Sequence, residues 1–388
     1  MSTDAERSSF FIALVAVDVL AGLADAMSGP YTVLFLVDQA RLEPLPLSAI
    51  LTVRALAGIA FGTAFGAWID RRVSVLPLLA ALAGSAIGYG LLGFTIDFAA
   101  LLVIAALPIA IGAAAFSQSI ALVKHEFEHA SFRTANRALG VLRASWSLAW
   151  AVGPAIGAIV ADAFGFRGAF LASSAAAVAA LVTLALVRAR PASGHARIDR
   201  PKPANGGPAI AIASAALALF YTSMFLGAIA LPIVLTTSLG GTKADVGWAM
   251  SLCAALEIVV MGALIWRPLG SRGVRAAMAI GFLAFVAYFV AIALAQSVGL
   301  VLWAQILRAI AIALVTYLGI GFLQSLMPHR PGAAAALFSN AGQAGSVASA
   351  LSIGALAHAF GYASIFIVCA ILSAAGLVLV GLAPPKSD

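Results

Sequence analysis

Apolar stretches long enough to cross a lipid bilayer follow one another through nearly the whole chain. A transmembrane helix needs about 20 consecutive apolar residues, and such stretches run from residue 10 to residue 383. The 388 residues are 63% hydrophobic and only 10% charged, whereas a soluble domain carries roughly 25% charged residues. The strands of a membrane barrel would show alternating segments of about ten residues instead of unbroken apolar runs. The sequence therefore predicts an all-α membrane protein.

Hydropathy and turn residues divide the chain into twelve predicted transmembrane helices. The first is too long for the core of a signal peptide and contains two aspartates, which indicates a retained helix. The predicted helices lie near residues 10–37, 46–69, 74–95, 98–122, 138–161, 166–188, 209–236, 243–268, 275–295, 299–326, 333–357 and 361–383.

Basic residues predict the orientation of these helices. The net charge of +7 alone would be compatible with nucleic-acid binding, but the basic residues lie in short gaps between apolar stretches, which favours a membrane protein without a nucleic-acid partner. Of 22 lysines and arginines, 16 fall on the side that holds both termini, which predicts that both termini are cytoplasmic. Three lie opposite and three lie within spans: Arg41, Arg167 and Lys243, and Arg54, Arg143 and Arg308.

Motifs for metal, cofactor or enzymatic chemistry are missing from the sequence. It has no CxxC, no His/Cys cluster and no phosphate-binding GxxxxGK[ST] loop. Cys253 and Cys369 both fall inside apolar stretches and indicate no disulfide framework. No nucleophile–base arrangement is apparent either. We therefore expect no metal, no cofactor and no enzyme, and any transport would have to use a gradient.

An internal repeat divides the predicted helices into two pseudo-symmetric six-helix halves. DAFGFRGAF at 162–170 returns as HAFGYASIF at 358–366, and Pro30 and Pro232 interrupt the first helix of each half at similar depth. The longest gap is rich in basic residues, Pro, Gly and Ser, which indicates a flexible cytoplasmic linker. We predict halves at 1–188 and 209–388 with a linker at 189–208. Parallel six-helix repeats that rock around a central site are the layout of the major facilitator superfamily.

Several stretches carry a more specific resemblance. GAWIDRR at 66–72 resembles the superfamily's G-x-x-x-D-R/K loop, although Val73 stands where a glycine is usual, and GPAIG at 153–157 resembles a motif common in its exporters. The chain also resembles the sugar efflux transporter family in MSGPYTVLFL (27–36), RASWSLAWAVGP (143–154), ALEI (255–258) and LQSLMPHRPGAAAALFSN (323–340). The resemblance implies export of lactose, glucose and related small glycosides against protons, from a bacterial inner membrane.

Three acids and three arginines lie in the interior of predicted spans, where each charge costs about 2.5–3.5 kcal/mol on insertion scales. We expect the two sets to neutralise each other. Candidates for proton coupling are Asp25, Glu257 and Asp18, and their candidate partners are Arg54, Arg143 and Arg308. The alternative is that the pairs only hold helices together.

The spacing of the acids gives more detail. Asp18 and Asp25 are seven residues apart and share one helix face, which we expect to look into a central cavity. Arg54 lies at a depth that Asp25 could approach. Arg143 could bind a glycoside, pair with Glu257 or join the cytoplasmic gate.

Neutral polar and aromatic residues could form a sugar site, because pyranose rings stack on aromatic rings while their hydroxyls need hydrogen-bond partners. Packing or interfacial anchoring is the alternative for each aromatic residue. The candidates are Trp146, Trp150, Tyr221, Tyr317, Gln324, Asn340 and Gln343. By the superfamily resemblance, the gate would consist of Gly66, Asp70, Arg71 and Arg72 together with Gly153, Pro154 and Gly157.

The sequence thus favours a proton-coupled exporter of small sugars with a small-molecule substrate, protons and the lipid bilayer as its partners. Its oligomeric state is left open. An exporter of amphipathic drugs would have the same architecture, but it would tolerate substitution of Asn340 and Gln343. A membrane sensor or assembly subunit that transports nothing is the alternative of another class.

Overall fold

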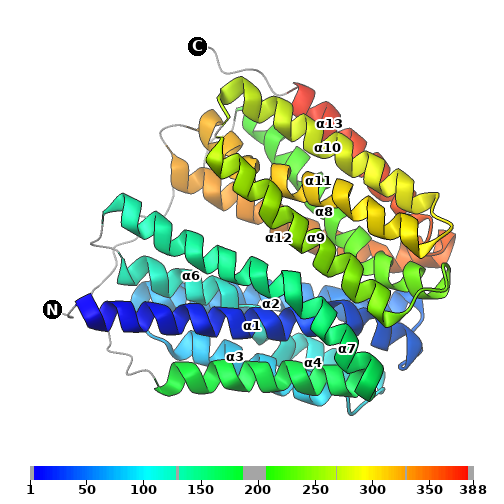
Figure 1. Ribbon diagram of the computed structural model, residues 1–388, viewed down its shortest axis with the longest axis horizontal. Coiled ribbons are helices and arrows are strands. Elements are labelled where there is room, and N and C mark those ends of the chain that lie inside the picture. Colours follow the sequence, from blue (N-terminus) through cyan, green and yellow to red (C-terminus); the bar gives the residue numbers. More distant parts are fainter. Residues whose placement is uncertain (1–3, 128–130, 187–206, 268, 328–329, 383–388) are drawn as a thin grey trace. The chain divides into compact units, whose positions relative to one another are not determined.

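The computed structural model describes residues 4–127, 131–186, 207–267, 269–327 and 330–382, and these ranges are almost entirely helical (Figure 1). The chain divides into two compact units. The first consists of Met1–Leu42 and Ala49–Ile198, and the second of Glu43–Ser48 and Asp199–Asp388. Most of the predicted linker, residues 189–206, lies outside the described residues.

The first unit is built around α1 (Asp4–Asp38), which packs along the long helix α7 (Phe132–Leu186). Between them in the chain lie α2 (Pro44–Arg71), α3 (Leu76–Leu92) and a segment from Phe98 to Glu126. This segment comprises α4 (Phe98–Ile104), a π-helical turn (Ala105–Ile109), α5 (Ala110–Gly112) and α6 (Ala115–Glu126). The π-helical turn contains Pro108, whose missing N–H interrupts the regular hydrogen-bond ladder.

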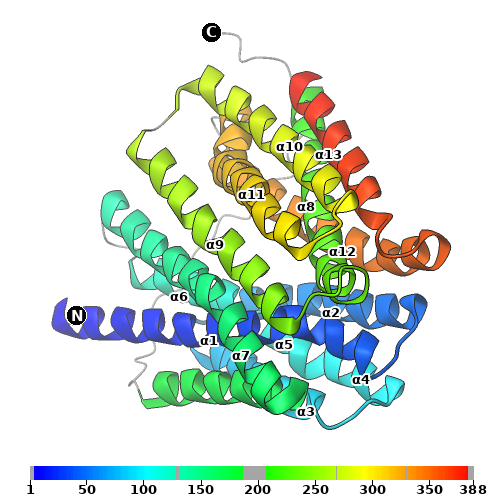
Figure 2. The same cartoon turned by 45° about the vertical axis from the view of Figure 1, so that its right-hand side comes forward.

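The second unit contains α8 (Pro208–Thr237), α9 (Lys243–Trp266), α10 (Ser271–Ala293), α11 (Val298–Leu326), α12 (Pro331–Phe360) and α13 (Ile365–Leu382). α8 packs on both α12 and α13, and α10 lies between α11 and α13 in both views (Figure 2). Its core contains interlocking aromatic rings, among them Phe220, Phe282, Phe285 and Phe289.

The internal repeat has the same backbone conformation in both units. Gly165 has φ 72° and ψ −178°, and Gly361 has φ 78° and ψ 162°. Residues other than glycine rarely adopt such a conformation, because their Cβ would clash with the backbone. Gly165 breaks α7 into two limbs, and Gly361 separates α12 from α13. The repeated AFG sequence thus marks the same turn between the last two helical segments of each unit.

Among the described residues, nine helices are long and apolar enough to cross a membrane. They include the two limbs of α7 as one helix, and α3 is apolar but shorter, at 17 residues. Within the described residues, the predicted span 98–122 falls on α4, the π-helical turn, α5 and α6 together, and each of the others falls on one helix or on one limb of α7. The number of twelve membrane crossings and the cytoplasmic position of the termini stay predictions.

Candidate functional site

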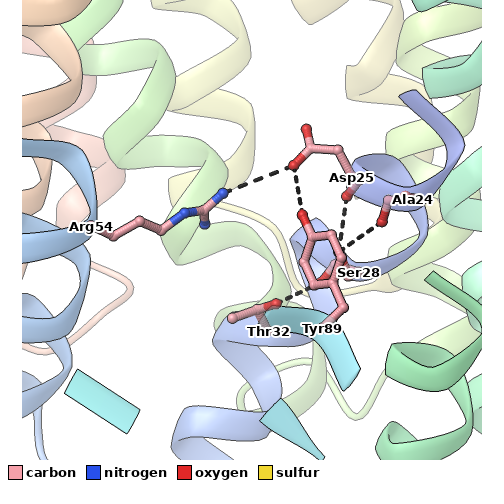
Figure 3. A network of polar contacts seen from close by, with 6 residues as sticks. All are labelled: Ala24, Asp25, Ser28, Thr32, Arg54 and Tyr89. Atoms are coloured by element: carbon pink, nitrogen blue, oxygen red, sulfur yellow. Dashed lines mark hydrogen bonds and ion pairs between the residues drawn. The ribbon is translucent and has the colours of Figure 1, made fainter. Parts of the chain in front are cut away.

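Asp25 lies at the centre of a polar network inside the first unit (Figure 3). Its Oδ1 accepts a hydrogen bond from the hydroxyl of Tyr89 on α3 at 3.0 Å, and the same oxygen is 3.9 Å from Nη2 of Arg54 on α2. The Asp25 and Arg54 side chains are each 32% exposed, whereas Tyr89 is buried. Three helices therefore bring an acid, a cation and a phenol together, and the expected approach of Asp25 and Arg54 is confirmed.

The geometry of this ion pair is loose. A direct hydrogen bond between a guanidinium and a carboxylate spans about 2.7–2.9 Å, so 3.9 Å leaves the two charges attracted but not bonded. The nearby hydroxyls of Ser28 and Thr32 turn back onto α1, where they donate to the carbonyls of Ala24 and Ser28 (Figure 3). The hydrogen bond and the ion pair of the Asp25 carboxyl thus both involve Oδ1, and the side chain stays partly exposed.

Asp18 has a different environment, and the expectation that it looks into a cavity is wrong. Its side chain is 0% exposed. Oδ2 accepts a hydrogen bond from the Ser145 hydroxyl on α7 at 2.8 Å, while Oδ1 is buried without a described hydrogen-bond partner. The helical period puts Asp18 on the same side of α1 as Asp25, but at this level α7 covers it.

Trp146 and Trp150 lie where α7 crosses the same face of α1. A Cβ placed on Gly22 would be 3.3 Å from the Trp146 ring, and one on Gly29 would be 3.4 Å from the Trp150 ring. Both tryptophans are half-buried, and Trp146 also packs on Phe116 with ring centroids 4.7 Å apart. These glycines precede and follow Asp25 by three and four residues, so the two indoles border the face of α1 that carries it.

The GPAIG sequence of α7 lies in close contact with α1. A Cβ on Gly153 would come 2.5 Å from the Ala26 Cβ, and one on Gly157 would lie as close to the Met27 backbone carbonyl. The hydroxyl of Tyr31 donates to the carbonyl of Pro154 at 2.7 Å. In this structure these residues hold α1 against α7; their predicted part in a gate stays a prediction.

The other predicted gate residues lie at the far end of α2. Asp70, Arg71 and Arg72 are exposed, and a Cβ on Gly66 would meet nothing within 4 Å. A hollow of ≈ 520 Å³ along this end of α2 is lined in part by Arg71 and Arg72. Its lining residue nearest to Arg54 in the chain is Ala64, 10 residues or about 15 Å of helix away, so the hollow is not part of the site around Asp25.

The neutral polar candidates of the second unit lie on α8, α11 and α12. Tyr221 packs beside Gly342 and contacts Phe338 edge-on, with ring centroids 5.8 Å apart. Asn340 and Gln343 are exposed and three residues apart, so they share one face of α12. Exposed amides are costly in lipid, which favours a water-filled space beside that face. On α11, Tyr317 is 39% exposed and Gln324 is half-buried.

The remaining charges of the spans do not form the expected set of pairs. Among the described residues, the six charges form one ion pair within a unit, between Asp25 and Arg54 of the first unit. Arg143 is exposed on α7. Its predicted partnership with Glu257 would join the two units and stays a prediction. Glu257 accepts a hydrogen bond from the Cys253 thiol, and Arg308 is buried beside Met250 and Gln305.

Sequence reasoning missed Tyr89 and Ser145, the two hydroxyls that bind Asp25 and Asp18. A single tyrosine in an apolar span has no pattern that separates a ligand of a carboxylate from a packing residue. Ser145 lies inside the stretch that resembles the sugar exporters, yet its role depends on how α7 crosses α1. Both contacts follow from helix packing and carry no signal in the spacing of the residues.

Comparisons with known proteins agree with this architecture. Residues 14–219 and 213–388 match the profile of the Major Facilitator Superfamily. The chain is 36% identical to a "Putative sugar efflux transporter" of Deinococcus radiodurans over 95% of this chain and 97% of the relative. It is 26% identical to "Sugar efflux transporter A" of Escherichia coli over 98% and 97% of the two chains.

Solved structures share the fold at low sequence identity. A bacterial homologue of the human lysosomal transporter Spinster, inward-facing and occupied, matches with a TM-score of 0.76 and 14% identity, over 98% of this chain and 97% of that one. The nucleoside transporter NupG matches with a TM-score of 0.69 and 13% identity, over 95% and 98% of the two chains.

Fold and sequence together define a helical, multi-pass membrane transporter and not an enzyme. The chain belongs to the major facilitator superfamily. Within it, the chain is similar to the sugar efflux transporters over nearly its whole length, as the stretches quoted above imply.

Proposed function

We propose that this chain exports small sugars or glycosides across a bacterial inner membrane in exchange for protons, with both termini cytoplasmic. The observation that carries the proposal is the half-exposed Asp25 carboxyl between the Tyr89 hydroxyl and the Arg54 guanidinium. An ionisable residue within a membrane span costs free energy of insertion, and such residues therefore mark functional sites. The similarity to proteins named as sugar efflux transporters supports the cargo.

In this mechanism Asp25 carries the proton. Ionised, the carboxylate is stabilised by the Tyr89 hydroxyl and by the charge of Arg54. A proton arriving from outside neutralises it and weakens its attraction to Arg54, whose five N–H donors then become available to sugar hydroxyls or water. Trp146 and Trp150, which border the same face of α1, offer rings on which a pyranose can stack. The two units alternate access around this exchange, as in other transporters built from repeats.

Replacing the polar residues of α12 tests the cargo. We expect Asn340→Leu and Gln343→Leu each to reduce counterflow of radiolabelled lactose and glucose in proteoliposomes. Each lost hydrogen bond to a sugar hydroxyl contributes about 0.5–1.5 kcal/mol, so a loss of several-fold is expected. A matched control is Ser352→Ala, because that exposed α12 hydroxyl bonds to its own helix. Unchanged sugar counterflow in both variants, with transport of lipophilic cations, would favour a drug exporter.

Substituting two buried tyrosines of the first unit distinguishes a role in proton coupling from a role in helix packing. Tyr89→Phe removes a donor to a charged carboxylate, an interaction of about 1.5–3 kcal/mol, and we expect a marked loss of proton-driven sugar transport with little change in Tm. Tyr31→Phe removes a donor to the Pro154 backbone, and we expect a lower Tm with proton-driven transport retained. If Tyr89→Phe changes only the Tm, its hydroxyl is structural.

A further inference from the structure

Arg308 is a buried cation that forms no salt bridge with any described residue of its unit. It lies in the middle of α11 and is only 8% exposed. Its Nη1 is 3.3 Å from Sδ of Met250 on α9 and 3.3 Å from Oε1 of Gln305. No described carboxylate of its unit lies within 4.0 Å. A guanidinium stays charged under all ordinary conditions, and a thioether and an amide compensate poorly for its lost hydration.

Among the described residues of the second unit, Glu257 is the carboxyl in the interior of a helix that packs against α11. It lies on α9, which packs against α11, seven residues after Met250, whose Sδ contacts Arg308. Seven residues are two helical turns, so Met250 and Glu257 share one face of α9. In this structure its Oε1 accepts a hydrogen bond from the Cys253 thiol, one turn earlier on α9, at 3.3 Å. The other ionisable groups that face Arg308 are Cys253 and the buried Tyr288 on α10. Glu257 and Arg308 are the only charged residues in the middle of the second unit's predicted spans.

We propose that Glu257 and Arg308 form a proton-dependent ion pair inside the second unit. With a proton on Glu257, the neutral carboxyl stays on the Cys253 thiol, as in this structure, and Arg308 stays on Met250 and Gln305. When the proton leaves to water, the carboxylate turns to the guanidinium and draws α9 toward α11. The charge of this interior changes from +1 to zero as one proton is released.

This pair would be a second proton-binding site, separate from Asp25 in the first unit. Its contribution to transport rests on the proposed function, but its chemistry does not. A rigid interhelical salt bridge would be made at every pH, whereas the proposed pair forms only after Glu257 ionises. The difference can be measured on the whole protein in lipid without any transport assay.

Thermal stability as a function of pH tests the pair. We expect the Tm of wild type to fall relative to that of Glu257→Gln as the pH rises, because the unfolded chain releases this proton more readily than the buried carboxyl does. The same comparison in an Arg308→Gln background should show a larger fall, since the ionised carboxylate has lost its cation. A Tm difference independent of pH, or one unchanged by Arg308→Gln, would overturn the proposal.

Infrared difference spectroscopy gives a second measurement that does not depend on stability. We expect a protonated-carboxyl C=O band in wild type at acidic pH that disappears as the pH rises and is absent from Glu257→Gln. In Arg308→Gln the band should persist to more alkaline pH, because the ionised form has lost its cation. Absence of any band that Glu257→Gln removes would also overturn the proposal. Neither result depends on whether sugars are the cargo.

Discussion

Asparagine in place of Asp25 is expected to abolish the response of sugar transport to a proton gradient while the protein remains folded. The amide has the same shape and can still accept a hydrogen bond from Tyr89, but it cannot bind or release a proton. Coupling between two binding sites typically amounts to 1–3 kcal/mol, or about 5–150-fold, and we expect a loss of gradient-driven efflux in this range. Proteoliposomes loaded with sugar, with and without an imposed pH gradient, measure it.

The control for this variant is Asp162→Asn, which removes an exposed carboxylate of α7 in the repeat sequence. We expect its gradient response to equal that of wild type. Sugar exchange without a gradient should continue in Asp25→Asn, because exchange does not require net proton movement. An Asp25→Asn protein that still responds fully to the gradient would remove Asp25 from the coupling mechanism.

A methyl group at position 157 is expected to destabilise the first unit strongly. A Cβ there would overlap the backbone carbonyl of Met27 and come 2.8 Å from the Tyr31 ring. Because the first obstacle is backbone, α1 and α7 must separate or bend. Overpacking of this kind costs about 1–3 kcal/mol, and it would also displace α1 next to Asp25. We therefore expect Gly157→Ala to lower the Tm by several degrees and to impair transport.

Gly140→Ala on the same helix is the matched control. A Cβ at position 140 meets nothing within 4 Å, so the better helix propensity of alanine should leave stability unchanged or raise it by up to about 1 kcal/mol. The two substitutions are chemically identical and differ only in what lies beside them. Equal Tm values for the two variants would contradict the close packing of α1 on α7.

Most of the fold could be predicted because the bilayer imposes its length on every helix. Apolar runs of about 20 residues located each helix, and the repeated AFG sequence indicated two equivalent halves. The sequence did not predict that both repeat glycines adopt positive φ, nor the π-helical turn around Pro108. These depend on how a local backbone distortion is accommodated by neighbouring helices, which one apolar span does not reveal.

The candidate site could be predicted only in part. Charge and depth brought Asp25 and Arg54 together correctly, because a buried charge needs a partner. The same reasoning failed for Asp18, since helical periodicity gives the face of a residue but not what covers it. Tyr89, Ser145 and Cys253 bind carboxyl groups through ordinary packing contacts, which require the arrangement of the helices to be known.

Counterflow of radiolabelled lactose and glucose by the wild-type protein in proteoliposomes, with and without an imposed pH gradient, tests the central claim most directly. We predict exchange of at least one of these sugars, accelerated when the gradient drives protons against the sugar. Sugar exchange that ignores the gradient would contradict proton coupling. Movement of lipophilic cations without exchange of either sugar would contradict the proposed cargo.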